Sequence, residues 1–264
     1  MEDITVIIPI HKLDDSNEQL FSDSLKSLFS QTEKIGQIII VGPENAMPKR
    51  KVSDNTTILI NNGDTDYCSQ INLAVKNVKT KYFSILEFDD TYTPNWFKNI
   101  KDYLKVKQDV SLLLPIIQYV DADKNDICLG NEISWTASFV DGEDRLGGID
   151  HDMLQGYYDF SPVGGVFKTK DFIEVGGLKP SIKLSFWYEF MLRLTSNDYK
   201  IFVIPKRGYV HMVNRGGSLT NETVGMEEKE KLFWLDLAKK EYYFKNERPE
   251  KAVYIIKKGI DEIL

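Results

Sequence analysis

Three carboxylates stand within four residues, directly after an apolar stretch. Tyr82–Leu86 is aromatic and aliphatic and too short for a helix of its own, so it predicts a buried β-strand. Glu87, Asp89 and Asp90 follow it. Because side chains alternate along a strand, we expect Glu87 and Asp89 to project to the same side at its carboxyl end. In open α/β sheets this edge is where ligands bind.

Two hypotheses explain this acidic triplet. Neighbouring carboxylates repel each other unless a proton or a cation lies between them, and hard oxygen ligands suit Mg²⁺ or Mn²⁺. Alternatively, Asp89–Thr93 forms an acidic turn that caps a helix beginning at Pro94, since proline is favoured at the first helical position. The local sequence does not decide between a metal site and a helix cap.

A further carboxylate lies on a segment that is apolar nearly all round. Ser185–Ser196 predicts a buried helix, in which Glu189 is costly unless it is paired, protonated or in a cleft. Arg193 lies four residues on, at the spacing of a helical ion pair. The other interpretation is a general base that works beside the acidic triplet.

A histidine, an arginine and a glycine pair share Tyr209–Thr220, which we expect to be a loop. Arg215 can hold phosphate oxygens in a bidentate way, and the glycines allow backbone N–H groups to face an anion. Together with Ser218 they predict an anion-binding loop. A single histidine such as His211 is more often a structural residue than a metal ligand.

These candidates need a framework that brings them together. Over the first hundred residues, strands alternate with helices at short spacing, which indicates βαβ units and a largely parallel sheet. The expected elements of this half are Ile4–Ile10, Leu20–Phe29, Gln37–Val41, Thr57–Ile60, Asp66–Val78 and Tyr82–Leu86.

The second half predicts more strands and helices in a less regular order. Pro115 requires a bulge or an edge position in its strand, and Gly164 and Gly165 would let another backbone or a ligand come close. The expected elements are a helix at Pro94–Val106, a strand at Val110–Val120, hairpin-like strands within Ile127–Val140, a helix at Lys170–Val175, a strand at Lys200–Pro205, and helices at Glu227–Phe244 and from Pro249.

Length and composition bound the class of protein. A chain of 264 residues with 42% hydrophobic and 28% charged residues is typical of one large globular domain, with or without an appendage. A net charge of −7 argues against a nucleic-acid partner. Cys68 and Cys128 form neither a disulfide framework nor a metal-ligand spacing. No apolar run approaches the roughly 20 residues of a membrane span, so we expect a cytoplasmic protein.

The ordered set of segments resembles family 2 glycosyltransferases of the GT-A fold. The resemblance rests on VIIPIHKLDD, NNGDTDYCSQINLAVKNVKTKYFSILEFDD, GGVFKTKDFIEVGGL, WYEFMLRL and VHMVNRGGSLT, which together span roughly residues 4–220. It implies a Rossmann-like, mostly parallel central sheet with helices on both faces and a C-terminal helical appendage. The domain would comprise residues 1–220, with a nucleotide-binding half (1–110) and an acceptor-binding half (111–220). Residues 221–264 would form a helical extension through which the protein could form homo-oligomers.

The resemblance also implies an activity and a set of site residues. The activity is metal-dependent, inverting transfer of a sugar from a nucleoside-diphosphate sugar to a hydroxyl of a glycan or similar acceptor, with Mn²⁺ or Mg²⁺ as cofactor. Asp89, Glu87 and His211 would hold the metal. The substrate-binding residues would be Pro9, His11, Asp14, Asn62, Asp64, Asn72, Glu87, Asp90, Gly164, Gly165, Trp187, Arg215 and Ser218.

Three departures from the family pattern leave alternatives open. Val41–Glu44 stands where the family has an acidic pair, and Glu87 is one methylene longer than the usual aspartate. Phe186-Trp187 occupies the place of the Glu-Asp pair that heads the catalytic helix. We therefore expect Glu189 to be the base, with Asp150 and Asp152 as substitutes.

The alternatives to a transferase follow from these departures. A glycosyltransferase-like nucleotide- or glycan-binding protein that has lost its base would also fit. A sugar-nucleotide nucleotidyltransferase fits less well, because the loop HKLDDSN after the first strand lacks the glycines and arginines that such an enzyme needs.

Overall fold

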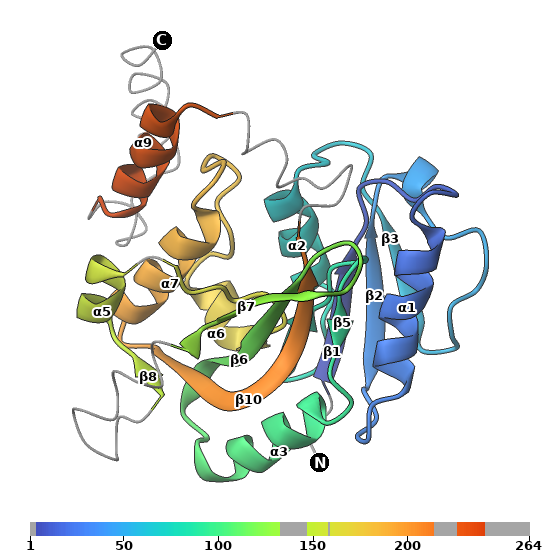
Figure 1. The fold of residues 1–264 in the computed structure, drawn as a ribbon, viewed down its shortest axis with the longest axis horizontal. Helices are drawn as coiled ribbons and strands as arrows, with labels where there is room; N and C mark the ends of the chain where they lie inside the picture. Colours follow the sequence, from blue (N-terminus) through green and yellow to red (C-terminus); the bar gives the residue numbers. More distant parts are fainter. Residues whose placement is uncertain (1–3, 133–146, 158, 214–225, 241–264) are drawn as a thin grey trace.

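A computed structural model describes residues 4–132, 147–157, 159–213 and 226–240, which form a ten-stranded sheet with helices on both faces (Figure 1). The strand order is β3-β2-β1-β4-β9-β6-β10-β5, with β7 on β6 and β8 on β10. Six strands run in one direction, namely β3, β2, β1, β4, β6 and β10, and β5, β7, β8 and β9 run in the opposite direction. The expected α/β class with a mostly parallel sheet is confirmed.

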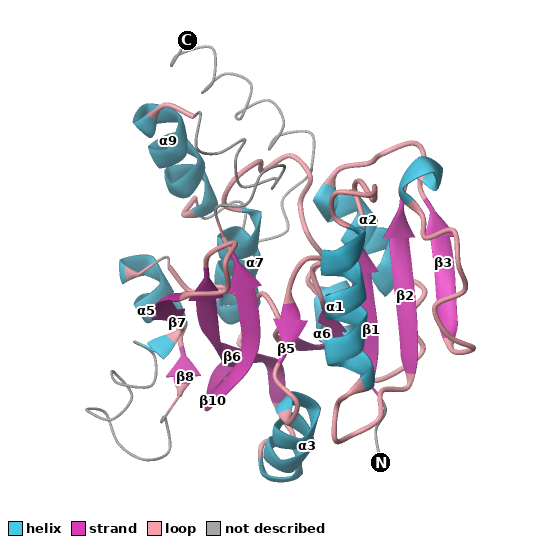
Figure 2. Cartoon of the chain, turned by 45° about the vertical axis from the view of Figure 1, so that its right-hand side comes forward, coloured by secondary structure: helices cyan, strands magenta, loops and turns pink. Residues whose placement is uncertain are grey.

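The first half follows the predicted βαβ pattern, with four parallel strands side by side. Figure 2 shows α1 in front of this part of the sheet and α2 behind it. The elements are β1 (Ile4–Pro9), α1 (Glu18–Phe29), β2 (Gln37–Gly42), a 3-10 turn (Glu44–Ala46), β3 (Thr56–Ile60), α2 (Tyr67–Val75) and β4 (Tyr82–Ile85).

The second half adds the antiparallel strands and the remaining helices. These are β5 (Thr91–Tyr92), α3 (Trp96–Val106), β6 (Val110–Val120), β7 (Asp126–Gly130), β8 (Gly148–Ile149), α5 (His151–Gly156), β9 (Val166–Lys168), α6 (Thr169–Glu174), α7 (Phe186–Ser196), β10 (Lys200–Met212) and α9 (Glu228–Ala238).

Side-chain alternation along the buried strands creates two hydrophobic layers. Ile7 of β1 packs in one cluster with Ile71 of α2, whereas Val6 and Ile8 pack in the other cluster with Phe21 of α1. A strand that is covered on both faces must be apolar throughout, and all six residues of β1 are buried. The continuous β-branched runs in the sequence have this cause.

One strand boundary differs from the sequence expectation in a way that changes the site. The strand expected to end at Pro205 continues to Met212. The hydrogen-bond ladder between β10 and β6 is interrupted between Val203 and Arg207, opposite Pro115, but it resumes beyond this bulge. A proline at a bulge removes no ladder hydrogen bond. His211 therefore lies on a strand and not on a loop.

The C-terminal part of the described chain packs against the main body. Trp234 of α9 is buried in the same cluster as the apolar side of α7, and its carbonyl accepts the Ser185 hydroxyl at 2.6 Å. Residues 241–264, which include the end of the helix predicted at Glu227–Phe244 and the whole of the helix predicted from Pro249, lie outside the described residues. Among the helices that are described, none has the length and hydrophobicity that crossing a bilayer requires.

Candidate active site

The acidic triplet forms a turn after β4. The strand ends at Ile85, and the Asp90 N–H donates to the Glu87 carbonyl at 3.1 Å, so Glu87 and Asp89 do not alternate along a strand as expected. The helix-cap hypothesis is also wrong, because β5 follows the turn and α3 begins only at Trp96, after Asn95. The structure removes this ordinary explanation for the three acids.

A histidine 121 residues away along the chain meets the turn. Asp90 Oδ2 lies 2.6 Å from His211 Nδ1, and Asp90 Oδ1 accepts the Met212 backbone N–H at 2.8 Å. Burial raises the pKa of Asp90. Burial acts to lower the pKa of His211, but the charge and hydrogen bond of Asp90 outweigh it and the pKa rises. The carboxyl edges of β4 and β10 are thus joined by a charge-assisted contact.

Glu87 is held from two sides by tyrosines. The Tyr67 hydroxyl donates to Glu87 Oε1 at 2.6 Å, and the Glu87 backbone N–H donates to the Tyr209 hydroxyl at 3.0 Å. Burial raises the pKa of the Glu87 carboxyl to about 8, and the charges of Asp90 and Asp89 add to the rise. An ionised Glu87 is therefore costly at neutral pH unless positive charge approaches it.

The fit of a divalent cation to this turn depends on how many ligands the protein must supply. Within the part of the chain that the structure describes, no group of three or more His, Cys, Asp or Glu side chains is arranged to hold a metal. Mg²⁺, however, usually binds through one or two carboxylates together with substrate phosphates and water. Asp89 and the Nε2 of His211, whose Nδ1 faces Asp90, could supply two ligands. A histidine oriented by a carboxylate is the usual arrangement at metal sites.

Glu189 lies in a buried ion pair. Its oxygens accept from Arg193 Nε and Nη2, each at 2.9 Å, and Lys179 Nζ lies 3.1 Å from Oε1. The side chains of Glu189 and Arg193 are both 0% exposed. A carboxylate that is sealed from solvent and held by two cations cannot receive a proton from a bound acceptor, so the expected base role is replaced by the ion-pair alternative.

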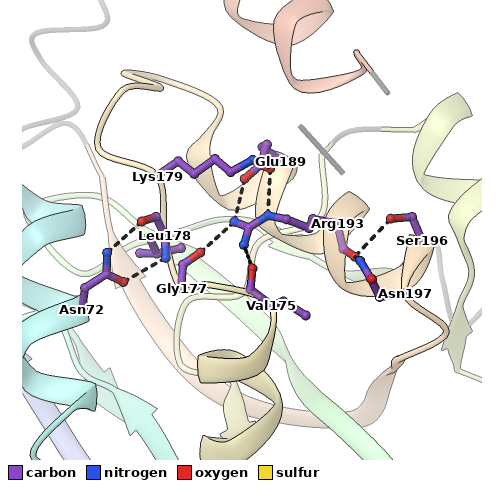
Figure 3. Close-up of polar contacts among 9 residues, drawn as sticks. All are labelled: Asn72, Val175, Gly177, Leu178, Lys179, Glu189, Arg193, Ser196 and Asn197. Atoms are coloured by element: carbon purple, nitrogen blue, oxygen red, sulfur yellow. Dashed lines mark hydrogen bonds and ion pairs between the residues drawn. The ribbon is translucent and has the colours of Figure 1, made fainter. Parts of the chain in front are cut away.

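Asn72 and Arg193 hold one loop from opposite sides, as Figure 3 shows. The Asn72 amide donates to the Leu178 carbonyl at 2.7 Å and accepts the Leu178 N–H at 2.9 Å. Arg193 donates to the carbonyls of Val175 and Gly177. Both sides of the Asn72 amide are used in this way, so its position is structural and not that of a substrate ligand.

The space beside the Cα atoms of Gly164 and Gly165 is filled by other parts of the protein and not by a ligand. Gly164 has φ +70°, and a Cβ there would lie 2.2 Å from the Tyr209 ring. A Cβ on Gly165 would lie 3.0 Å from the Leu113 carbonyl oxygen. Of the two alternatives for this pair, close approach of the protein to itself is the one observed.

The expected nucleobase residues lie at the start of the chain and in the turn after β3. Pro9 ends β1, and the His11 ring meets the Phe88 ring edge-on at 5.3 Å, which places it beside the acidic turn. Asp14 pairs with Lys12 at 2.8 Å. The Asn62 side chain accepts the Glu44 N–H at 2.9 Å, and Asp64 is exposed.

The remaining predicted residues are not brought to the turn or cannot be placed. Asp150 and Asp152 belong to the start of α5, which follows β8, and β8 pairs with Ile201, ten residues before His211 on β10. They therefore lie near the opposite end of that strand and are wrong as substitutes for the base. The predicted anion ligands Arg215 and Ser218 lie outside the described residues.

Sequence reasoning missed the aromatic residues that surround the turn. Tyr67, the first residue of α2, reaches Glu87, and Tyr209 reaches the backbone of the same residue. The Tyr119 ring meets the His211 ring edge-on at 5.5 Å. Aromatic residues on strands and helices usually serve core packing, so their presence alone did not indicate a site. The one signal in the sequence was the position of Tyr67 at the start of a helix.

Comparison with known proteins identifies a fold. The chain matches no protein-family model and no curated protein. Among solved structures, S. aureus TarS 1–349 is 13% identical with a TM-score of 0.57, over 80% of this chain and 60% of that one. Its complex with UDP-GlcNAc is 13% identical with a TM-score of 0.62, over 98% and 71%. The UDP complex is 11% identical with a TM-score of 0.59, over 99% and 92%. The chain thus has the GT-A-like α/β fold that its sequence predicts.

Proposed function

We propose that this chain is a glycosyltransferase that moves a sugar from a nucleoside-diphosphate sugar to a hydroxyl group of a glycan or similar acceptor. The observation that carries the proposal is the 2.6 Å contact of Asp90 with His211, which joins the acidic turn to β10 at the ligand-binding edge of the sheet. TarS has a similar fold and occurs in complexes with UDP-GlcNAc and UDP. A uridine nucleotide is therefore the first donor to test.

A divalent cation, Mn²⁺ or Mg²⁺, is the proposed cofactor. When bound, it would offset the charge that develops on the departing nucleoside diphosphate. Asp89 and His211 Nε2 are its proposed protein ligands, and Asp90 holds the His211 ring in orientation. Glu87 would face the ribose or the water around the ion.

Other residues complete the proposed donor site. Pro9 and His11, at the end of β1, would border the nucleobase. Arg215 and Ser218 are proposed to hold the diphosphate, and this assignment rests on the sequence alone.

The proposed base is Asp159. It is exposed, and its charge contributes to the raised pKa of Tyr119, although burial is the larger cause. Tyr119 in turn contacts the His211 ring, and this link is the support for choosing Asp159. Asp159 would take the proton of the acceptor hydroxyl as its oxygen bonds to the anomeric carbon and the bond to the diphosphate breaks. A single displacement of this kind inverts the anomeric centre.

Release of UDP from UDP-GlcNAc and related donors, with Mn²⁺ or with EDTA, tests the proposal. We expect Mn²⁺-dependent release, and we expect Asp159→Asn to lower it by about a hundredfold. Asp123→Asn, a matched change at the exposed turn before β7, should leave it unchanged. If no nucleotide sugar is consumed with either metal and a panel of glycan acceptors, the proposed activity is wrong.

One observation favours a second candidate function. Glu189, the acid nearest the start of α7, is buried in an ion pair with Arg193. Phe186 and Trp187 occupy the positions at which the family pattern has its acidic pair. A protein that binds a nucleotide sugar without transferring it would fit this arrangement. Donor binding without donor consumption, in wild type as in Asp159→Asn, would establish this alternative.

A further inference from the structure

One hydrogen bond connects the start of α2 to the acidic turn. The Tyr67 hydroxyl donates to Glu87 Oε1 at 2.6 Å. An ionised carboxylate only accepts, so Tyr67 is the donor when a bound cation keeps Glu87 ionised. The ring of Tyr67 packs in turn against the start of α7.

The aromatic rings around Tyr67 leave its side chain little freedom. The Tyr67 ring lies 5.5 Å from Phe186 and meets Trp187 edge-on at 6.3 Å. Trp187 in turn stacks on Phe167 of β9 at 5.5 Å, with 25° between the ring planes. Such packing limits the rotamers of Tyr67 and Trp187.

The buried polar network of Figure 3 fixes the two helices that carry these residues. Asn72, five residues after Tyr67 on α2, binds the backbone of Leu178, and Arg193 on α7 binds the neighbouring carbonyl of Gly177 at 2.7 Å. Glu189 neutralises Arg193 at 2.9 Å. The two helices are therefore held to one loop, α2 by Asn72 in its second half and α7 by Arg193 in its last turn.

We infer that Tyr67 is a positioning residue that holds the Glu87 carboxylate in one orientation for the bound donor and its cation. The inference rests on the proposed function. Oε1 of Glu87 is occupied by Tyr67, which leaves Oε2 to face the ribose or the water around the ion. The Phe-Trp pair at the start of α7 then supports the donor side of the site by packing against the Tyr67 ring, and does not supply a base.

A double-mutant cycle tests this inference on the full-length chain. The measured quantity is the Kd of Mn²⁺ in saturating UDP, by titration calorimetry, for wild type, Tyr67→Phe, Glu87→Ala and the double variant. Loss of a group that orients a metal-site side chain typically weakens binding 10- to 100-fold, so we expect at least a tenfold rise in Kd for Tyr67→Phe. In the Glu87→Ala background the same substitution should change Kd less than twofold, because Tyr67 acts through Glu87.

Tyr199→Phe is the matched control. Its hydroxyl also donates to a glutamate, Glu174, at 2.8 Å, but at the opposite end of β10. We expect no change in Kd for this variant. Should Tyr67→Phe fail to fold, Trp187→Phe, which keeps an aromatic ring but reduces the surface that packs against Tyr67, carries the same cycle with a smaller effect.

The outcomes separate this inference from the proposed function. If wild type binds Mn²⁺ with UDP and consumes a donor, but Tyr67→Phe has the wild-type Kd or an equal effect in both backgrounds, the positioning role is overturned and the function stands. If wild type binds no Mn²⁺ with UDP or any other nucleoside diphosphate, the function and the positioning role are both overturned.

Discussion

Replacing Glu189 by glutamine separates a structural role from a catalytic one. The carboxylate receives two hydrogen bonds of 2.9 Å from Arg193, and both side chains are 0% exposed. Glutamine keeps the shape but leaves the guanidinium charge without a counter-ion. Breaking one side of a buried pair costs about 3–5 kcal/mol. For a chain of this size that lowers Tm by about 6–20 °C.

Urea unfolding followed by circular dichroism measures the loss. Asp102→Asn, which removes exposed pairs with Lys98 and Lys105, is the control and should cost less than about 1 kcal/mol. Replacing both partners, Glu189→Leu with Arg193→Met, should recover only part of the stability, because it removes the buried guanidinium charge but leaves Lys179 without its counter-ion and the Val175 and Gly177 carbonyls without their donor. Donor consumption by the Glu189→Gln variant, measured below its Tm, should persist.

The opposite pattern would refute this reasoning. If Glu189→Gln unfolds at the wild-type urea concentration and yet consumes no donor, the carboxylate does not serve the fold and acts in the chemistry. The ion pair of Glu189 would then have to open when substrate binds.

Two further predictions concern Gly164 and Glu87. Gly164→Ala should lower the free energy of unfolding by about 2–4 kcal/mol, because the added Cβ would lie 2.2 Å from the Tyr209 ring at a φ of +70°. Gly156→Ala is the control: its added Cβ would have no atom within 4 Å, so the substitution should cost under about 1 kcal/mol. The Glu87 carboxyl has a folded pKa of about 8, above its ordinary value of 4.5, so its contribution to stability is present at low pH and is lost as pH rises from 4.5 towards 8. These two pKa values correspond to a loss of roughly 3–4 kcal/mol of stability between pH 5 and pH 8. Glu87→Gln without metal should therefore gain roughly that much stability relative to wild type over this range, by urea unfolding at each pH. A difference between the two proteins that is the same at both pH values would contradict this.

The fold was predictable because it rests on local patterns. The β-branched runs of β1 and β2 could only be strands buried on both faces, and the helices between them require parallel pairing. The extent of β10 was not predictable, since Pro205 is a common strand end and its bulge depends on Pro115, ninety residues earlier.

The site was only partly accessible to sequence reasoning. The residue types of the acidic turn and His211 indicated which residues could do chemistry, but the direct contact of Asp90 with His211 is a consequence of the strand order. The partners of Glu189 include Lys179, which reaches it from a loop, and no helical spacing reveals that contact. Tyr67 has the side chain of an ordinary core residue until Glu87 is seen beside it.

The most direct test of the account is the affinity for UDP with and without a divalent cation. Titration calorimetry on wild type and Asp89→Asn, in Mn²⁺ and in EDTA, measures it. We predict that Mn²⁺ tightens UDP binding to wild type at least tenfold and that Asp89→Asn abolishes this gain while keeping the wild-type Tm. UDP affinity that is the same in Mn²⁺ and EDTA, or a Mn²⁺ gain that survives in Asp89→Asn, would contradict a metal-assisted donor site at the acidic turn.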